Sequence, residues 1–339
     1  MEKKIVLLLT TLVVAFIFCG AASAATVNTN HTNTVKVNKV AATVDQFEPA
    51  IDGTRIIWTQ GDASGHSAIY YKNLATGSTG KVLISTQNQF KSDISGTKVV
   101  WEQYDSLNHS SVYYKDLATG GYGRVLTSSQ NQTLAKISGS RIVWMQGDPT
   151  HGQTTIYERN LASGYVGRVS SSTQDQSFPD ISGTRVVWMQ MDSNGRSYIY
   201  EKNLASGYLG KVFTSTQDQA FPSISGTRVA WMQMDSTGYS AIYYKNLSSG
   251  YITKVIESTR TMYFPVIDRT TVVWQPAIGG PSIYYKNLAT GTSRKITSTQ
   301  IFDPNISGTR IVWAQSDTSG HYAIYVKNLT TGKTVKLTP

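Results

Sequence analysis

Short apolar runs separated by polar turns recur along most of the chain. In the stretch 177–219, four such runs lie at 178–181, 185–190, 198–202 and 211–214, and they are rich in β-branched and aromatic residues. Gly, Asn, Asp and Ser stand between them, as is typical of strands joined by tight turns. No run is long enough for a helix or has a 3.6-residue period. The pattern therefore predicts four β-strands in this stretch.

A tryptophan in the second run repeats at spacings of 43, 43, 44, 43, 43 and 39 residues. The residues in this series are Trp58, Trp101, Trp144, Trp188, Trp231, Trp274 and Trp313. A period of about 40–45 residues with four strands in each unit is typical of a β-propeller. We therefore predict an all-β fold, a seven-bladed β-propeller over 46–339 with four antiparallel strands in each blade. A β-sandwich with tryptophan-marked hairpins is the alternative.

The sixth unit departs from the repeat. Asp268-Arg269-Thr270 replaces the usual Ser-Gly-Thr turn, and a shorter loop carrying two prolines follows Trp274. This irregular unit is either a degraded repeat or a point at which a partner docks.

The N-terminal 24 residues have the features of a secretory signal peptide. Two lysines precede the apolar segment 5–18, and Ala22-Ser23-Ala24 is a small-residue cleavage site, so we expect the mature chain to begin at Ala25. A retained membrane anchor is the alternative. Cys19, the only cysteine, lies within this segment, so the mature chain is expected to contain no disulfide.

Residues 25–45 are rich in Thr, Asn and Val and show no turn rhythm. We interpret them as a flexible leader that could contribute a clasp strand to the ring, and the sequence does not decide whether it does. No second segment reaches the length needed to span a membrane. The product is expected to be secreted or held at the cell surface.

The motif F-P-x-I-S-G-T-R-V-V-W at 178–188, followed by I-Y-x-K-N-L-A-x-G at 199–207, resembles the TolB-type propeller repeat. It is most similar to the version found in surface-layer and cell-surface proteins of methanogenic archaea, and the likeness extends over 46–339. The resemblance implies an exported propeller whose work is contact with other molecules. It implies no catalytic residues, because this class of repeat has no shared active site.

The chain is basic, with a formal net charge of +10. In an antiparallel blade, the turns after strands one and three share one end, here called the turn face, and the loops after strands two and four share the other, here called the loop face. Most cations fall near the turn face. An aspartate recurs in the loop after strand two, as Asp62, Asp105, Asp148, Asp192, Asp235 and Asp317. The sequence thus predicts a polarised disc whose cationic face attracts anionic polymers.

The alternative is that the cations solvate strand ends and the aspartates cap turns. Polarised discs could also stack on one another, which leaves self-association open.

Exposed tyrosines beside cations are expected at the third turn of units two to five. These residues are Tyr122, Tyr165, Tyr208 and Tyr251, with Arg124, Arg168, Lys211 and Lys254. Tyrosine is favoured at interfaces because it has a large apolar body and a polar tip. This arc could bind glycans or proteins, and packing of the rim is the alternative. No motif for nucleic-acid recognition is present.

No constellation of catalytic, metal-ligating or cofactor-binding residues stands out, so we expect no cofactor and no metal. The hypothesis is a non-enzymatic binding or scaffold module of the cell envelope, with envelope proteins, glycans or anionic polymers as partners. The alternative is a polysaccharide lyase or hydrolase that uses the central face of the propeller.

Overall fold

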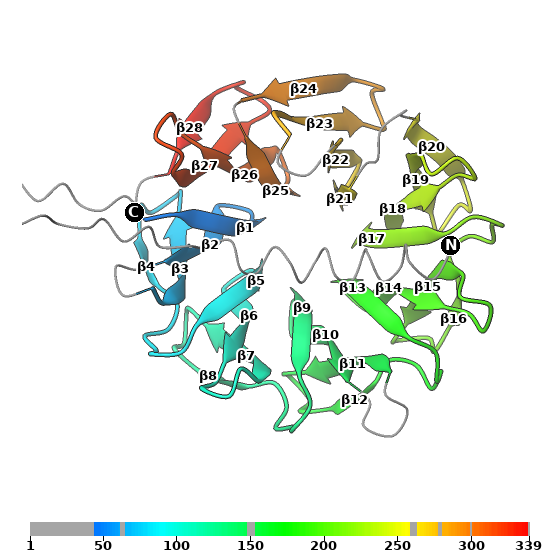
Figure 1. The fold of residues 1–339 in the computed structure, drawn as a ribbon, viewed down its shortest axis with the longest axis horizontal. Helices are drawn as coiled ribbons and strands as arrows, with labels where there is room; N and C mark the ends of the chain where they lie inside the picture. The colour runs from blue at the N-terminus through cyan, green and yellow to red at the C-terminus, as the bar shows by residue number, and fades with distance from the viewer. Residues whose placement is uncertain are drawn as a thin grey trace, which may run out of the picture.

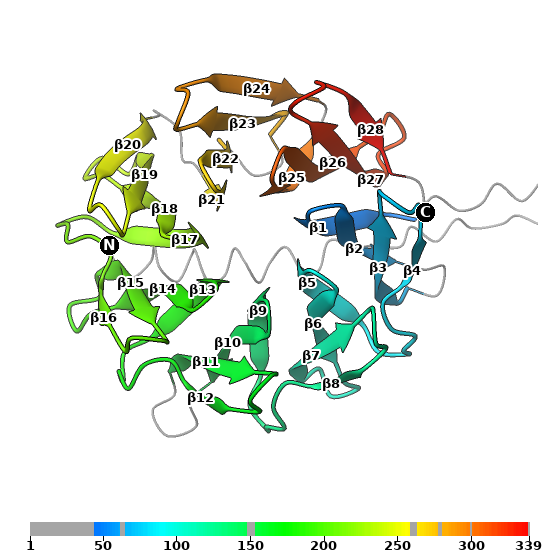
Figure 2. The same ribbon diagram turned by 180° about the vertical axis from the view of Figure 1, so that it is seen from behind.

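A computed structural model describes residues 44–61, 65–147, 153–257, 263–276, 280–298 and 300–337. Over these residues the chain forms seven four-stranded antiparallel sheets, each made of four consecutive strands. The sheets surround a common axis as the blades of a propeller (Figures 1 and 2). The predicted fold class is confirmed, and the sandwich is excluded. The predicted signal peptide and the leader up to residue 43 lie outside the described residues.

The first strand of each blade lies nearest the axis, and the second strand lies next to it, further from the axis (Figure 1). The inner strands are β1 (Gln46–Asp52), β5 (Gln89–Ser95), β9 (Gln132–Ser138), β13 (Gln176–Ser182), β17 (Gln219–Ser225), β21 (Tyr263–Asp268) and β25 (Ile301–Ser307). The second strands are β2 (Arg55–Gly61), β6 (Lys98–Tyr104), β10 (Arg141–Gly147), β14 (Arg185–Met191), β18 (Arg228–Met234), β22 (Thr271–Gln275) and β26 (Arg310–Ser316).

The third and fourth strands complete each blade towards the rim. The third strands are β3 (Ser67–Asn73), β7 (Ser110–Asp116), β11 (Thr154–Asn160), β15 (Ser197–Asn203), β19 (Ser240–Asn246), β23 (Ser282–Asn287) and β27 (Tyr322–Asn328). The outer strands are β4 (Thr79–Lys81), β8 (Tyr122–Arg124), β12 (Val166–Arg168), β16 (Leu209–Lys211), β20 (Ile252–Glu257), β24 (Ser293–Thr297) and β28 (Thr334–Lys336).

The predicted position of the fourth strand was wrong by two to three residues. In the fourth blade the apolar run 211–214 suggested the strand, whereas β16 ends at Lys211. Val212 is only 1% exposed, and Phe213 packs against the cluster that contains Trp231 of the next blade. These apolar residues therefore leave the sheet and fill the interface between blades.

Each tryptophan seals the interface between its own blade and the preceding one. Trp101, for example, packs in one cluster with Ile57, Ile69 and Val82 of the first blade. All seven tryptophans are 0 or 1% exposed, and each stacks on a third-strand tyrosine at centroid distances of 5.8–6.1 Å. The tryptophans repeat in the sequence because each fills an equivalent buried interface. Truncating such a side chain to alanine costs about 3–5 kcal/mol.

A glutamine at the start of the inner strand joins the same two blades, and we call this arrangement the glutamine clip. Gln132 Oε1 accepts a hydrogen bond from Val112 N at 3.0 Å, and Gln132 Nε2 donates to Gln146 Oε1 at 3.1 Å. Gln146 Oε1 also accepts from Trp144 Nε1 at 3.1 Å. The glutamines that bond in the same way to the preceding blade are Gln46, Gln89, Gln176 and Gln219.

The last blade packs directly on the first. Asp45 Oδ1 accepts from Tyr322 N at 2.8 Å, and Ser307 Oγ accepts from Gly53 N at 3.0 Å. The second contact completes a circle of seven, in which a serine or aspartate at the end of one inner strand binds a turn amide of the next blade. The described residues therefore close the ring without an exchanged strand. Asp45, the last residue of the predicted leader, belongs to this interface.

The interfaces on both sides of the sixth blade lack the clip glutamine. Ile301 stands at the glutamine position of the seventh blade, and Met262, outside the described residues, stands at that of the sixth. Gln275 Nε2 instead donates to the backbone carbonyl of Ile301. The sixth unit thus differs from the repeat in its blade contacts as well as in its sequence.

Candidate binding surface

Three of the four predicted tyrosines occupy one equivalent position. Tyr165, Tyr208 and Tyr251 directly precede the outer strand, and the carbonyl of each accepts a hydrogen bond from the asparagine that ends the third strand, at 2.8–2.9 Å. Their side chains are 54, 54 and 61% exposed. They therefore present large amphipathic surfaces on three consecutive blades of the turn face.

Tyr122 is one residue out of register with the other three. Gly121 occupies their position, because its carbonyl accepts the corresponding bond from Asp116 N. Tyr122 itself is the first residue of β8 and lies opposite Lys115. A shift of one residue moves a side chain to the other face of a strand. Tyr122, which is 61% exposed, therefore shares the face of Lys115, whose ammonium group donates to the carbonyl of Val82 in the first blade.

The predicted cations of the outer strands stack on tyrosines of the third strands. Their charges lie 5.5 Å (Arg124), 5.9 Å (Arg168 and Lys211) and 5.7 Å (Lys254) from the centroids of the tyrosine rings that stack on the tryptophans, and Lys211 lies closer still, at 3.3 Å, to the ring of Tyr198. Each cation thus ends a tryptophan–tyrosine–cation stack across its blade. Such cation–π contacts contribute about 0.5–1 kcal/mol at exposed sites, so these cations support the rim as well as adding charge to it.

The cations near the end of the third strand link neighbouring blades. Lys202 Nζ donates to the carbonyl of Val169 in the third blade at 2.6 Å. The residues that make the equivalent contact are Lys115, Arg159, Lys245 and Lys286. Their partners are neutral carbonyl groups, so these bonds leave the positive charges uncancelled.

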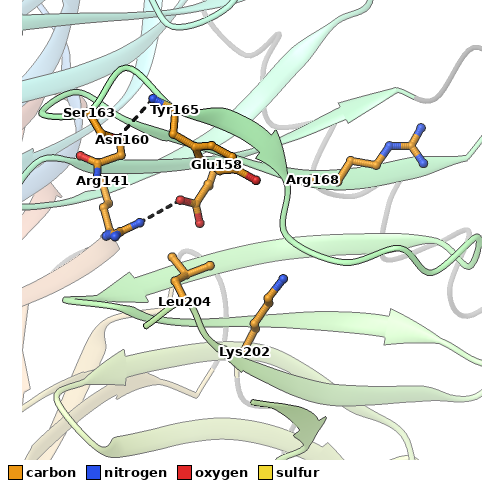
Figure 3. Close-up of a pocket in the computed structure, with 8 residues that line it drawn as sticks. All are labelled: Arg141, Glu158, Asn160, Ser163, Tyr165, Arg168, Lys202 and Leu204. Atoms are coloured by element: carbon orange, nitrogen blue, oxygen red, sulfur yellow. Dashed lines mark hydrogen bonds and ion pairs between the residues drawn. The ribbon is translucent and has the colours of Figure 1, made fainter. Parts of the chain in front are cut away.

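A pocket lies between the third and fourth blades on the turn face (Figure 3). Its cavity volume is about 260 Å³, and its walls are Arg141, Glu158, Asn160, Ser163, Tyr165, Arg168, Lys202 and Leu204. Glu158 is 4% exposed, and its Oε1 accepts from Arg141 Nη1 at 2.8 Å. The guanidinium of Arg168 points away from this pair, whereas Lys202 and Leu204 face it from the fourth blade (Figure 3).

Burial raises the pKa of Glu158, and the positive charges of Arg141 and Lys202 partly oppose that shift. A β-carbon added at Gly167 would lie 2.3 Å from the hydroxyl oxygen of Tyr165. The side chain of Tyr165 can lie over its own outer strand only because residue 167 is a glycine. The predicted residue Tyr165 thus comes together with a buried ion pair that sequence reasoning did not single out.

The loop-face aspartates bond to the backbone of their own hairpins. Asp105 Oδ1 accepts from Leu107 N and from His109 N, both at 2.9 Å. The aspartates that cap the equivalent loops in the same way are Asp192, Asp235 and Asp317. The N–H of His109 makes the largest contribution to a lowered pKa of Asp105. Asp62 and Asp148 lie outside the described residues, and an acidic binding ring on this face stays a prediction.

Sequence reasoning missed a ring of residues at the axis, here called the axial ring. Its members, one from each inner strand, are Glu48, Lys91, Leu134, Phe178, Phe221, Phe264 and Asp303. Each has a left-handed backbone with φ between 48° and 53°, at a bulge in the pairing with the second strand. Strained backbone of this kind occurs often at functional sites.

The axial ring is asymmetric. The ring of Phe221 lies 4.7 Å from that of Phe178 and 4.4 Å from that of Phe264. On the charged side, Glu48 Oε2 accepts from Lys91 N at 2.8 Å, and burial together with the charge of Glu48 raises the pKa of Asp303 to about 7. The available signal in the sequence was a position that varies between units and stands three residues before a repeated isoleucine. Within the described residues, no group of three His, Cys, Asp or Glu side chains could hold a metal ion.

No helix in the part of the chain that the structure describes is long and apolar enough to cross a membrane. No protein-family model matches the sequence, and the search of curated proteins found no match.

Solved structures share the fold at low sequence identity. The β-propeller domain of the Trilobed protease from Pyrococcus furiosus, described as having an open velcro topology, has a TM-score of 0.69 at 13% identity, covering 88% of this chain and 96% of that one. An oligogalacturonate lyase in complex with manganese has a TM-score of 0.65 at 13% identity, with coverage of 84% and 89%. TolB from Acinetobacter baumannii has a TM-score of 0.55 at 14% identity, with coverage of 74% and 66%. The chain therefore has a TolB-like propeller fold, a fold shared by peptidases, a lyase and TolB.

Proposed function

We propose that this protein is an exported, non-enzymatic binding module that holds proteins or glycans of the cell envelope on its turn face. The observation that carries the proposal is the exposure of 54–61% at Tyr165, Tyr208 and Tyr251 on adjacent blades. The predicted signal peptide and the resemblance of the repeat to archaeal surface-layer propellers support the location.

The other blades indicate that these tyrosines are not needed to build the turn. The residues at the same position in the remaining four blades are Ser78, Gly121, Thr292 and Lys333, and their carbonyls make the same hydrogen bond. Neighbouring exposed aromatic side chains that the fold does not require are typical of interaction surfaces.

The test is binding of the purified chain to envelope preparations and to a glycan array. Replacing Tyr165, Tyr208 and Tyr251 together with serine is expected to abolish binding while leaving the melting temperature unchanged. Tyr239→Ser is the matched control, because Tyr239 is 47% exposed in the second-strand loop of the opposite face. The proposal would be contradicted if the wild-type protein bound nothing in either assay, or if Tyr239→Ser lost as much binding as the triple variant.

A polysaccharide-cleaving enzyme is the second candidate, and the axial ring favours it. Asp303 with a pKa of about 7 lies beside Glu48, an arrangement in which one carboxyl group could donate a proton and the other accept one. Incubation with uronate polymers tests this candidate through new reducing or unsaturated ends. Ends that appear with the wild type and not with Asp303→Asn would support it, and their absence in both would exclude it for these substrates.

A further inference from the structure

Key residues of the inter-blade pocket have counterparts one blade further on. In the third blade Arg141 pairs with Glu158, and in the fourth blade Arg185 pairs with Glu201. Both glutamates are 4% exposed, and each blade carries an exposed tyrosine before its outer strand. The residues at the glutamate position in the other five blades are Tyr71, Tyr114, Tyr244, Tyr285 and Val326. The combination of arginine, buried glutamate and exposed tyrosine therefore occurs only in the third and fourth of the described blades.

The two sets of residues also share their local geometry. A β-carbon added at Gly210 would lie 2.6 Å from the Tyr208 hydroxyl, so Tyr208 crosses its strand as Tyr165 does over Gly167. The far wall of the pocket contains Lys202, which bonds to the carbonyl of Val169. In the next blade Lys245 bonds in the same way to the carbonyl of Val212, at 2.6 Å.

The size and the polar and aromatic groups of the pocket suit a single sugar ring. The cavity, about 260 Å³, is smaller than the pockets of about 300–1,000 Å³ that hold drug-sized ligands. Tyr165 offers an aromatic face, and Asn160 and Ser163 add polar groups to the wall. The ion pair of Arg141 and Glu158 is neutral as a unit, whereas the charge of Lys202 is not cancelled by its carbonyl partner. The pocket is therefore net positive and favours a sugar that carries a carboxylate.

We propose that the pocket beside Tyr165 and the equivalent position beside Tyr208 are tandem subsites for a polysaccharide containing uronic acids, with one unit bound at each. This inference rests on the proposed function and specifies its ligand. Because the subsites lie on consecutive blades, a chain long enough to reach both binds more tightly than a single sugar through effective concentration.

Titration calorimetry of the full chain tests this, with oligomers of galacturonate, glucuronate and mannuronate of increasing length and neutral cello-oligosaccharides for comparison. At least one acidic series is expected to bind, more tightly with length and more weakly with added salt. Tyr165→Ser and Tyr208→Ser are each expected to weaken binding of long oligomers about 10-fold, as loss of one aromatic contact predicts.

Tyr239→Ser is the control and is expected to leave this affinity unchanged. Tyr251 faces Tyr244, with centroids 6.5 Å apart, where the subsites have a glutamate, so Tyr251→Ser is expected to weaken binding less than either subsite variant. Absence of binding to every acidic series, equal affinity for neutral oligomers, or equal effects of all four variants would overturn the proposal. If envelope binding persists and requires all three turn-face tyrosines while the acidic oligomers do not bind, the proposed function stands and the uronate subsites fail. If the envelope preparations do not bind either, both fail.

Discussion

At the scale of single residues, the charge of Asp303 depends strongly on its place in the fold. It lies at the axis, where partial removal from solvent and the neighbouring charge of Glu48 raise its pKa from 3.8 to about 7. The residue nevertheless keeps an exposed surface, so solvent screens part of the effect. Because the folded state binds this proton more tightly than the unfolded state, Asp303 lowers stability increasingly as the pH rises from its ordinary pKa through about 7.

Replacing Asp303 with asparagine is therefore expected to stabilise the protein in alkaline solution and to reduce the fall in stability between about pH 5 and about pH 8. The measurement is the urea midpoint of unfolding at both pH values. Asp235→Asn is the control with the opposite sign. Hydrogen bonds lower the pKa of Asp235, and the hydroxyl of Thr237 makes the largest contribution. The carboxylate of Asp235 therefore stabilises the fold above the ordinary pKa, and this stabilisation is lost as the pH falls through the pKa of the folded state. An identical midpoint difference between wild type and Asp303→Asn at both pH values would refute this assignment.

Tyr165, Arg168 and the recurring aspartates could be selected from the sequence because they repeat with the unit. The misplacement of Tyr122 arose from a one-residue difference between Gly-Tyr-Gly-Arg and Gly-Tyr-Val-Gly-Arg. Glu158 could not be selected, because its role depends on Arg141 and on a wall from the next blade. The axial ring was missed because its residues share a position rather than a residue type.

At the scale of strands and blades, the glutamine clip connects elements that are distant in sequence. Gln132 is 1% exposed and is the hydrogen-bond acceptor for the buried N–H of Val112. Replacement of Gln132 with leucine keeps a side chain of similar size but leaves this donor unsatisfied, which costs about 1–3 kcal/mol.

Chemical denaturation of Gln132→Leu is therefore expected to show a loss of about 1–3 kcal/mol in the free energy of unfolding. Gln130→Leu, two residues earlier and outside the clip, is expected to cost much less. Equal stability of Gln132→Leu and the wild type would show that the clip does not contribute.

The number and order of the blades could be predicted because a buried tryptophan marks every interface. The outer strands could not be placed accurately, because strands of three residues such as Leu209–Lys211 are too short to show a period. Val212 and Phe213 continue the apolar run into the blade interface, which moved the predicted strand towards them. The closure of the ring could not be predicted, because it depends on contacts of Asp45 and Gln46 with the last blade.

At the scale of the whole molecule, the sequence predicts an exported chain that begins at Ala25. Mass spectrometry of the protein recovered from a secreting host is expected to give the mass of residues 25–339, because Ala22-Ser23-Ala24 matches the specificity of signal peptidase. Recovery of a chain that keeps residues 1–24 in the cell membrane would favour the anchored alternative.

The central claim is that partners bind at the turn face of the propeller. The most direct test places a photo-crosslinking amino acid at position 208 on the turn face, and in a second variant at position 239 on the loop face, before exposure to envelope preparations. The wild-type side chains at these positions are 54 and 47% exposed, so both positions are accessible. Crosslinked partners from position 208 and none from position 239 are the predicted result, and crosslinks from position 239 alone would contradict the account.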